Sequence, residues 1–333
     1  MVKKIIFSAL AMMTIFLTLY PEENKKKESK ETSLSPLLQY EVIVTATRLA
    51  TQTKEVATSV TVITREELER TQKITVLEAL HDVLGLAVLQ NGPAGSAGSV
   101  FLRGANTEHT LVMLDGIEIN DPISPSRSFD LAHLFVEDIE RIEILRGPQS
   151  TLYGSDALGG VIHIITRKGE GKPRIKLSTQ GGSYTTYSGS AGINGSTDKV
   201  NYSFSASYFK TSGFSAASTS YPGNEEEDGY ENTTLSARVG FHPLDNLDFD
   251  FIARTLKTKV DIDNFGGAYG DDPNNIQRYD AFFLKSQVRS LLLSNRWEQI
   301  LGISLVTYNR QYENPTDDLH PADSETGMYK RIC

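Results

Sequence analysis

The sequence predicts a small α+β domain followed by long antiparallel β-strands that cross a membrane. Up to residue 168, short β-branched runs alternate with helix-start signals, whereas after residues 169–173 the apolar period becomes 2. Beyond the N-terminus no stretch approaches the ~18 consecutive apolar residues of a membrane helix. Any passage through a membrane must therefore use a β-barrel, in which neighbouring strands satisfy each other's backbone groups. The expected segments are a signal peptide, a flexible leader, the α+β domain and the barrel strands, at 1–20, 21–46, 47–168 and 169–333.

The N-terminus has the pattern of an export signal. Two lysines precede residues 5–19, a run of 15 mostly apolar residues. The run is shorter than the ~20 residues of a membrane span, but it has the basic and apolar regions of a secretory signal. A buried core helix is the alternative, and the polar, lysine-rich sequence that follows at once argues against it. Residues 22–36 are rich in Lys, Glu and Ser and are expected to form a disordered tether.

Composition argues against several functional classes. The only cysteine is Cys333, so a disulfide framework and a metal–thiolate site are both excluded. The net charge of −9 argues against nucleic acid as a partner. The chain has no Gly-x-Ser-x-Gly elbow, no His-Glu-x-x-His pair and no phosphate loop, and its 6 histidines lack metal-ligand spacing. We therefore expect that the protein is not an enzyme.

Two capping boxes predict the helices of the α+β domain. Thr64 with Glu67 opens one helix after a strand at 60–63, and Thr75 with Glu78 opens the other. The second helix should be stopped by Gly85 and carry three leucines on one face, Leu77, Leu80 and Leu84. Short strands are expected at 86–89, 100–102, 111–114, 117–119 and 142–145, and Asp115-Gly116 is a strong hairpin signal between the third and fourth.

About seven long strands with period 2 follow. They are expected at 174–181, 185–193, 200–210, 234–242, 247–257, 281–291 and 296–310. In 200–210 aromatic residues alternate with small polar ones, which suits a strand with lipid on one side and a wet lumen on the other. A soluble sandwich strand would alternate similarly, and the repeated length of about 10 residues favours the membrane. Long polar linkers at 212–233 and 259–279 have the character of extracellular loops, and the short linkers that of periplasmic turns.

Residues 145–167 contain the most specific motif of the chain. They read Leu-Arg-Gly-Pro-Gln-Ser-Thr-Leu-Tyr-Gly-Ser-Asp-Ala-Leu-Gly-Gly-Val-Ile-His-Ile-Ile-Thr-Arg, and an Arg-Gly element at 100–104 and the turn at 114–116 precede them. In this order the motifs resemble the plug domain of TonB-dependent outer-membrane receptors over roughly residues 40–167. The resemblance is strongest to the vitamin B12 (cobalamin) branch, through residues 90–92, 103–104 and 154–160.

The resemblance implies a gated importer in the outer membrane of a Gram-negative bacterium. The plug would be followed by strands of a barrel of the ~22-stranded type, in contact with outer-membrane lipid. Its partners would be TonB, with the inner-membrane motor proteins that supply the work, and a scarce small-molecule substrate. Cobalamin leads, and a ferric siderophore or haem is the alternative, because residues 121–126 depart from the cobalamin pattern. A passive adhesin would need no plug, and a soluble periplasmic enzyme would show catalytic clusters.

A short β-prone run lies between the leader and the α+β domain: Glu41, Val42, Ile43, Val44, Thr45 and Ala46. On its own it could be an edge strand of the domain that follows. Its position resembles that of the TonB box, which in this family adds a strand to the periplasmic energy-coupling protein. The resemblance therefore predicts that this run is the TonB box.

The resemblance also assigns roles to residues of the plug. Substrate would be captured by two apical loops, at 91–99 and 120–127, with the residues Asn91, Ser96, Ser99, Asn120, Asp121, Ser124, Ser126 and Arg127. Arg103 and Arg146 would hold the plug against acidic groups of the barrel wall. The alternative for these two arginines is that they are exposed turn residues.

The two long loops concentrate acidic residues, of which six are candidate calcium ligands: Glu227, Asp228, Asp261, Asp263, Asp271 and Asp272. Carboxylates on loops are commonly just solvated, and calcium, which takes several oxygen ligands, is the alternative. Cobalamin receptors use calcium to order the same pair of early loops. The stretch 261–266 mimics the start of an EF-hand but has Phe265 in place of a ligand, so it is not an EF-hand. No other cofactor is expected.

The number of strands bears on completeness. Residues 174–333 offer about seven strands, whereas bacterial single-chain barrels have even numbers, and two open edges in lipid would leave backbone groups unpaired. We therefore expect the chain to be the front part of a receptor, unable to transport alone. The remoter alternative is a non-transporting fragment of an interrupted gene.

Overall fold

Two large β-sheets organise the protein. The computed structural model describes residues 42–43, 51–52, 59–124, 127–218, 220–222, 224, 226–263, 269–272, 274–294, 296–316 and 323–332. The predicted signal peptide and tether lie outside the described residues. Among the described residues, no helix is both long and apolar enough to cross a membrane.

The two predicted capping boxes are confirmed. Thr64 caps α2 (Arg65–Thr71) by accepting a hydrogen bond from Glu67 N at 3.4 Å. Thr75 caps α3 (Val76–His81) by accepting from Glu78 N at 3.2 Å. The second helix is shorter than predicted, because it ends at His81 and the chain turns before β4. Leu84 therefore lies outside the helix, 88% exposed, and its predicted place on one helix face with Leu77 and Leu80 was wrong.

The α+β domain contains a five-stranded sheet in the order β3-β8-β9-β6-β7. Its strands are β3 (Ser59–Thr64), β6 (Thr110–Leu114), β7 (Ile117–Glu118), β8 (Ile139–Arg146) and β9 (Gly160–Thr166). All neighbours are antiparallel except β6 and β9, which are parallel. The predicted hairpin between β6 and β7 is present, and its two turn residues, Asp115 and Gly116, have φ of 50° and 79° as a type I′ turn requires.

The remaining small elements surround this sheet. A separate hairpin pairs β4 (Leu86–Gln90) with β5 (Gly98–Leu102), and a two-residue ladder pairs β1 (Val42–Ile43) with β2 (Thr51–Gln52). The helical turns are η2 (Thr107–His109), η3 (Leu131–His133), α4 (Ser150–Tyr153) and η4 (Ser155–Ala157). The loop between β4 and β5 and the segment around η3 both contact Tyr230 of the second sheet.

The second sheet is antiparallel and, in the part of the chain that the structure describes, has eight strands in sequence order. They are β10 (Arg174–Gly182), β11 (Thr186–Ser196), β12 (Val200–Thr211), β13 (Tyr230–Leu244), β14 (Leu247–Asp261), β15 (Ile276–Leu292), β16 (Trp297–Asn314) and β17 (Asp323–Ile332). All seven predicted strands are present, and β17, which pairs with β16, is one more than predicted. The argument from an odd number of strands therefore no longer holds.

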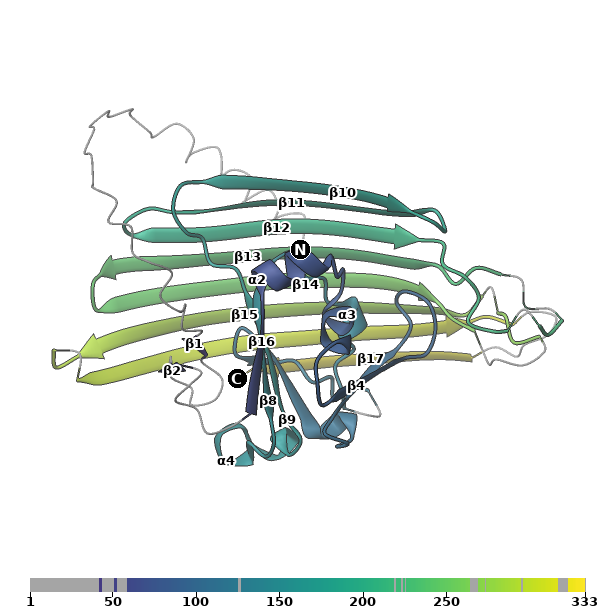
Figure 1. Ribbon diagram of the computed structural model, residues 1–333, viewed down its shortest axis with the longest axis horizontal. Helices are drawn as coiled ribbons and strands as arrows, with labels where there is room; N and C mark the ends of the chain where they lie inside the picture. Colours follow the sequence, from purple (N-terminus) through teal and green to yellow (C-terminus); the bar gives the residue numbers. More distant parts are fainter. Residues whose placement is uncertain are drawn as a thin grey trace. The chain divides into compact units, whose positions relative to one another are not determined.

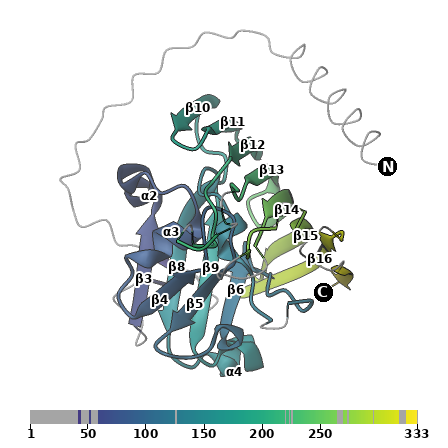
Figure 2. The ribbon, with the colours of Figure 1, turned by 90° about the vertical axis from the view of Figure 1, so that its right-hand side faces the viewer.

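Successive residues of these strands face opposite sides, as the period of 2 predicts. On β14, Ile252, Arg254 and Leu256 are almost fully buried, whereas the neighbouring Phe251 is 47% exposed. The buried face packs on the α+β domain, and both contribute to one hydrophobic core. Figure 2, which looks along the strands, shows the α+β domain on one side of the sheet. The predicted alternation is confirmed, but the inner face carries apolar residues where it contacts the domain.

The loops of the sheet differ in length between its two ends. Long connections follow β12 and β14, at 212–229 and 262–275, while the turns at 197–199, 245–246 and 293–296 are short. Figure 1 shows the long connections together at one end of the strands. Because β12 to β15 are adjacent in the sheet, the two long loops emerge side by side.

Candidate functional site

Three carboxylates from the two long loops converge at this end of the sheet. Glu226 and Asp228 lie just before β13, and Asp263 follows β14. One oxygen of each lies within 4.8 Å of the others. Asp228 is only 2% exposed. This arrangement places three oxygen ligands of the kind that a hard cation prefers around one point.

Some oxygens of this cluster accept hydrogen bonds from backbone N–H groups, and others have no hydrogen-bond partner. Ala216 N donates to Asp228 Oδ2 at 2.6 Å, and Ala217 N donates to Asp263 Oδ2 at 2.5 Å. Several buried oxygens of the described residues lack a hydrogen-bond partner, and those that belong to this cluster are Glu226 Oε2, Asp228 Oδ1 and Asp263 Oδ1. Buried acceptors without partners are costly unless something compensates them. A cation bound by these three oxygens would do so.

The electrostatics of the cluster support the same interpretation. Burial, followed by the charge of Asp228, raises the pKa of Glu226 to about 8. Burial also raises the pKa of Asp228 to about 7, with Asp263 adding to the rise. The pKa of Asp263 is raised by burial and by Asp271. Each carboxylate therefore resists ionisation beside the others, and a bound cation would reverse that resistance.

The structure brings together only part of the predicted calcium set. Asp228 and Asp263 are in the cluster, and Asp271 lies beside it, accepting from Ser215 Oγ at 2.7 Å. Asp272 is buried at the start of the segment leading to β15 and accepts from Asn314 Nδ2 at 2.9 Å. The cluster instead contains Glu226, which the prediction passed over.

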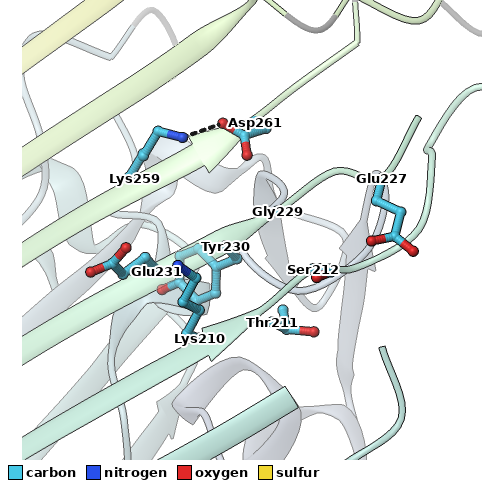
Figure 3. A pocket seen from close by; sticks show the side chains of 9 residues that line it. All are labelled: Lys210, Thr211, Ser212, Glu227, Gly229, Tyr230, Glu231, Lys259 and Asp261. Atoms are coloured by element: carbon cyan, nitrogen blue, oxygen red, sulfur yellow. Dashed lines mark hydrogen bonds and ion pairs between the residues drawn. The ribbon is translucent and has the colours of Figure 1, made fainter. Parts of the chain in front are cut away.

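Glu227 and Asp261 line a separate open pocket of about 210 Å³. There Lys259 Nζ lies 2.8 Å from Asp261 Oδ1, so the carboxylate of Asp261 is already paired with the lysine ammonium group. Glu227 stands apart from that pair (Figure 3). The i, i+2 spacing of Glu226 and Asp228 could have indicated this pair, because in an extended segment alternate side chains face the same side and the intervening Glu227 faces the other.

Two of the predicted substrate residues, Asn120 and Asp121, make hydrogen bonds or ion pairs within the protein. The Asn120 side chain accepts from Val112 N at 2.8 Å and donates to Thr110 O and to Arg127 O. Asp121 is 1% exposed and pairs with Arg310 of β16 at 3.0 Å. Both side chains fix the loop after β7, and a substrate role for them stays a prediction.

The other predicted substrate residues differ in their access to solvent. Asn91 and Arg127 are exposed, and Ser96, Ser99 and Ser124 are half-buried. Arg127 makes only a loose ion pair with Asp156, at 3.9 Å. Ser126 lies outside the described residues. A substrate role for these six residues stays a prediction.

The contacts between the α+β domain and the eight-stranded sheet have one polarity. Arg254 of β14 pairs with Asp138 at 2.5 Å, and both are buried. Arg238 of β13 contacts Asp115 at 3.1 Å and donates to Thr166 O at 3.1 Å. In every ion pair between domain and sheet that the described residues make, the sheet contributes the basic residue and the domain the acidic one: Lys176–Glu69, Arg238–Asp115, Arg254–Asp138, Arg310–Asp121 and Arg331–Glu118.

That polarity is opposite to the one implied for Arg103 and Arg146. Arg103 is exposed at a turn with φ 52°, and Arg146 is 7% exposed. Burial, followed by the charge of Arg103, lowers the pKa of Arg146. Within the described residues neither arginine is in an ion pair, and their contact with acidic barrel groups stays a prediction.

Comparison with known families identifies the α+β domain. Residues 52–161 match the family model of the TonB-dependent Receptor Plug Domain. The chain therefore carries a TonB-dependent receptor plug. The match covers the five-stranded sheet except residues 162–166 of β9, and it includes all the plug acids that pair with the eight-stranded sheet.

Solved receptors share the fold of plug and sheet together. The chain matches a mutant ferric enterobactin receptor of Pseudomonas aeruginosa in complex with enterobactin, with TM-score 0.64 and 18% identity over 82% of this chain and 45% of that one. It matches the ferripyoverdine receptor of the same organism with TM-score 0.66 and 15% identity, over 88% and 40%. The ferric yersiniabactin uptake receptor of Yersinia pestis gives 0.62 and 18%, over 78% and 42%. The chain thus spans less than half the length of these receptors.

Proposed function

We propose that the protein imports a scarce nutrient across the outer membrane of a Gram-negative bacterium, using energy delivered by TonB. The observation that carries the proposal is a receptor plug packed against one face of long antiparallel strands whose other face is apolar. Exposed Ile175, Leu177, Leu301 and Ile303 on that outer face suit contact with lipid. The chain would reach the outer membrane through the predicted signal at 1–20.

The proposed cycle breaks no covalent bond. Substrate would bind at the end of the sheet that carries the long loops, above the plug. The run 41–46 would then bind TonB by adding a strand, since two of its residues already form β1. The proton gradient, transmitted by the inner-membrane motor proteins, would supply the work that moves the plug.

For the substrate we propose cobalamin first. Support comes from the resemblance to cobalamin receptors and from the carboxylate cluster, which occupies the pair of loops that such receptors order with calcium. A ferric siderophore is the second candidate, because receptors for ferric enterobactin and ferric yersiniabactin share the fold.

Uptake measurements separate these substrates. A full-length receptor that contains this chain is expressed in a strain that lacks its own cobalamin and siderophore receptors, and radiolabelled cobalamin is compared with ferric enterobactin and haem. We expect energised uptake of cobalamin alone, abolished by a proton uncoupler. Uptake of ferric enterobactin without cobalamin would transfer the proposal to the second candidate, and uptake of neither cobalamin, iron chelate nor haem would contradict it.

We further propose that Glu226, Asp228 and Asp263 bind calcium. Replacing Asp228 and Asp263 with asparagine keeps the size of both side chains but removes two charges. Because calcium affinity depends on the charge of the ligand set, we expect the dissociation constant to rise at least about 100-fold by calorimetric titration with calcium alone. Glu227→Gln is the matched control, since it removes a charge from the same loop outside the cluster. Equal loss in control and variant would contradict the assignment.

Calcium affinity should also depend on pH. The pKa values of Glu226 and Asp228 are raised to about 8 and about 7, above the ordinary ~4 of carboxylates. The metal-free cluster therefore holds protons at pH 6 that calcium has to displace, and fewer at pH 8. We expect calcium to bind more tightly as pH rises from 6 to 8 and the Glu227→Gln variant to follow the same curve. A pH-independent affinity would contradict this.

A further inference from the structure

Tyr230 stands where the long loop 212–229, the sheet and the plug meet. It is the first residue of β13, two positions after Asp228, and it is 3% exposed. Its hydroxyl lies 3.1 Å from His133 Nδ1 and accepts a hydrogen bond from Asn232 Nδ2 at 2.9 Å. Its ring packs against Phe209 with centroids 5.8 Å apart. The ring is therefore fixed on several sides.

The plug residue His133 is clamped between two tyrosines of the sheet. Its ring stacks on Tyr230 with centroids 5.7 Å apart and on Tyr279 with centroids 5.8 Å apart. Asn232 Nδ2 also donates to His133 O at 3.1 Å. Burial lowers the pKa of His133, so the imidazole is neutral and its Nδ1 can accept from the Tyr230 hydroxyl. The segment around η3 thus moves only if this clamp moves.

The plug loop at 91–98 contacts the same ring. Gly95 has φ +88°, and a Cβ at that position would clash with Tyr230 Cδ2, so the loop backbone lies directly against the ring. Gly98 N donates to Asp130 Oδ1 at 3.2 Å, and Asp130 precedes η3. The loop is therefore joined to Tyr230 both directly and through the segment that holds His133.

We propose that Tyr230 is a positioning residue that couples cation binding at Glu226, Asp228 and Asp263 to the conformation of plug loop 91–98. The inference rests on the cation site proposed above. Only Gly229 lies between the ligand Asp228 and Tyr230 in the chain, so ordering of the loop by a cation fixes the backbone from which the ring projects. Because the ring is closely packed, its position is passed to Gly95 and His133.

Hydrogen exchange of the plug loop tests this coupling. The intact protein is folded in detergent, and exchange of the amides in 91–98 is measured with and without calcium, the only added ligand. Couplings between sites commonly amount to about 5–150-fold, and we expect calcium to slow exchange about tenfold in the unmutated protein. Tyr230→Leu, which lacks the ring, should still bind calcium but lose this slowing. Tyr187→Leu, on the exposed face of the sheet, is the control and should retain it.

The outcomes separate the inference from the cation site. Equal slowing in Tyr230→Leu and the unmutated protein overturns the coupling and leaves the cation site standing, as does calcium binding with no slowing in the unmutated protein. Absence of calcium binding overturns both. If Tyr230→Leu fails to fold, Tyr230→Phe, which loses only the hydroxyl, decides: reduced slowing with calcium still bound supports the coupling, and undiminished slowing overturns it.

Discussion

Replacing Val42 with proline is expected to abolish energised uptake while substrate still binds at the cell surface. Val42 pairs with Gln52 in the two-residue ladder of β1 and β2, so this backbone already adopts the strand that TonB would extend. Strand addition depends on main-chain hydrogen bonds, and proline removes a donor and fixes φ. Uptake of radiolabelled substrate should fall to the level seen with a proton uncoupler, and binding to whole cells at 4 °C should be unchanged.

Two variants show whether the backbone of 41–46 is responsible. Val42→Ala keeps the N–H group and should retain uptake, while Lys30→Pro, in the predicted tether, should be silent. Val44→Pro should reproduce the loss, because strand addition involves the whole run. Normal uptake by the Val42→Pro and Val44→Pro variants would show that this run is not the TonB box.

Local rules predicted the plug well. Thr64 and Thr75 cap their helices as the sequence indicates, since a capping box depends only on residues three positions apart. The turn at Asp115-Gly116 is equally local. Leu84 failed because helical spacing alone does not show where a helix ends, and here the chain turns after His81.

Alternation predicted the strands of the sheet except the last. β17 begins with Asp323-Ser324-Glu325-Thr326, a polar run that shows no apolar alternation. The segment is a strand because its backbone pairs with β16, and that pairing is not visible in the sequence. The sequence likewise did not predict that the sheet supplies the basic partner and the plug the acidic partner in their ion pairs. Arg238 and Arg254 are ordinary strand residues in the sequence, and only the register of β13 and β14 turns both toward the plug.

The sequence predicted that the two long loops carry acidic residues, but not which of these residues come together. Sequence shows that carboxylates gather at 225–228 and 261–272, whereas the choice of Glu226 over Glu227 depends on which side chain of one loop comes close to Asp263 of the other. Asn120 and Asp121 make contacts that the sequence did not predict. Polar residues of an apical loop suggested substrate binding, but the loop itself uses them for its own hydrogen bonds and for Arg310.

Replacing Asp138 with asparagine is expected to destabilise the folded protein by about 3–5 kcal/mol, the usual cost of leaving one partner of a buried ion pair alone. The Arg254 and Asp138 side chains are 1% and 8% exposed. Among the described residues, Arg254 Nε and Nη2 have no hydrogen-bond partner, so Asp138 is the main compensation for the buried charge. The free energy of unfolding is measured by urea titration of the detergent-folded protein, followed by far-UV circular dichroism.

A second pair provides the control for burial. Arg278 and Glu313 lie 2.8 Å apart with side chains 39% and 53% exposed, and Glu313→Gln should change the unfolding free energy by only about 0–1 kcal/mol. Adding Arg254→Met to Asp138→Asn removes the uncompensated cation and should recover most of the loss, because the cost lies in the unpaired charge and not in the missing contact. If the double variant is as unstable as Asp138→Asn, or if Glu313→Gln costs as much, the plug is not held to the sheet by this buried pair.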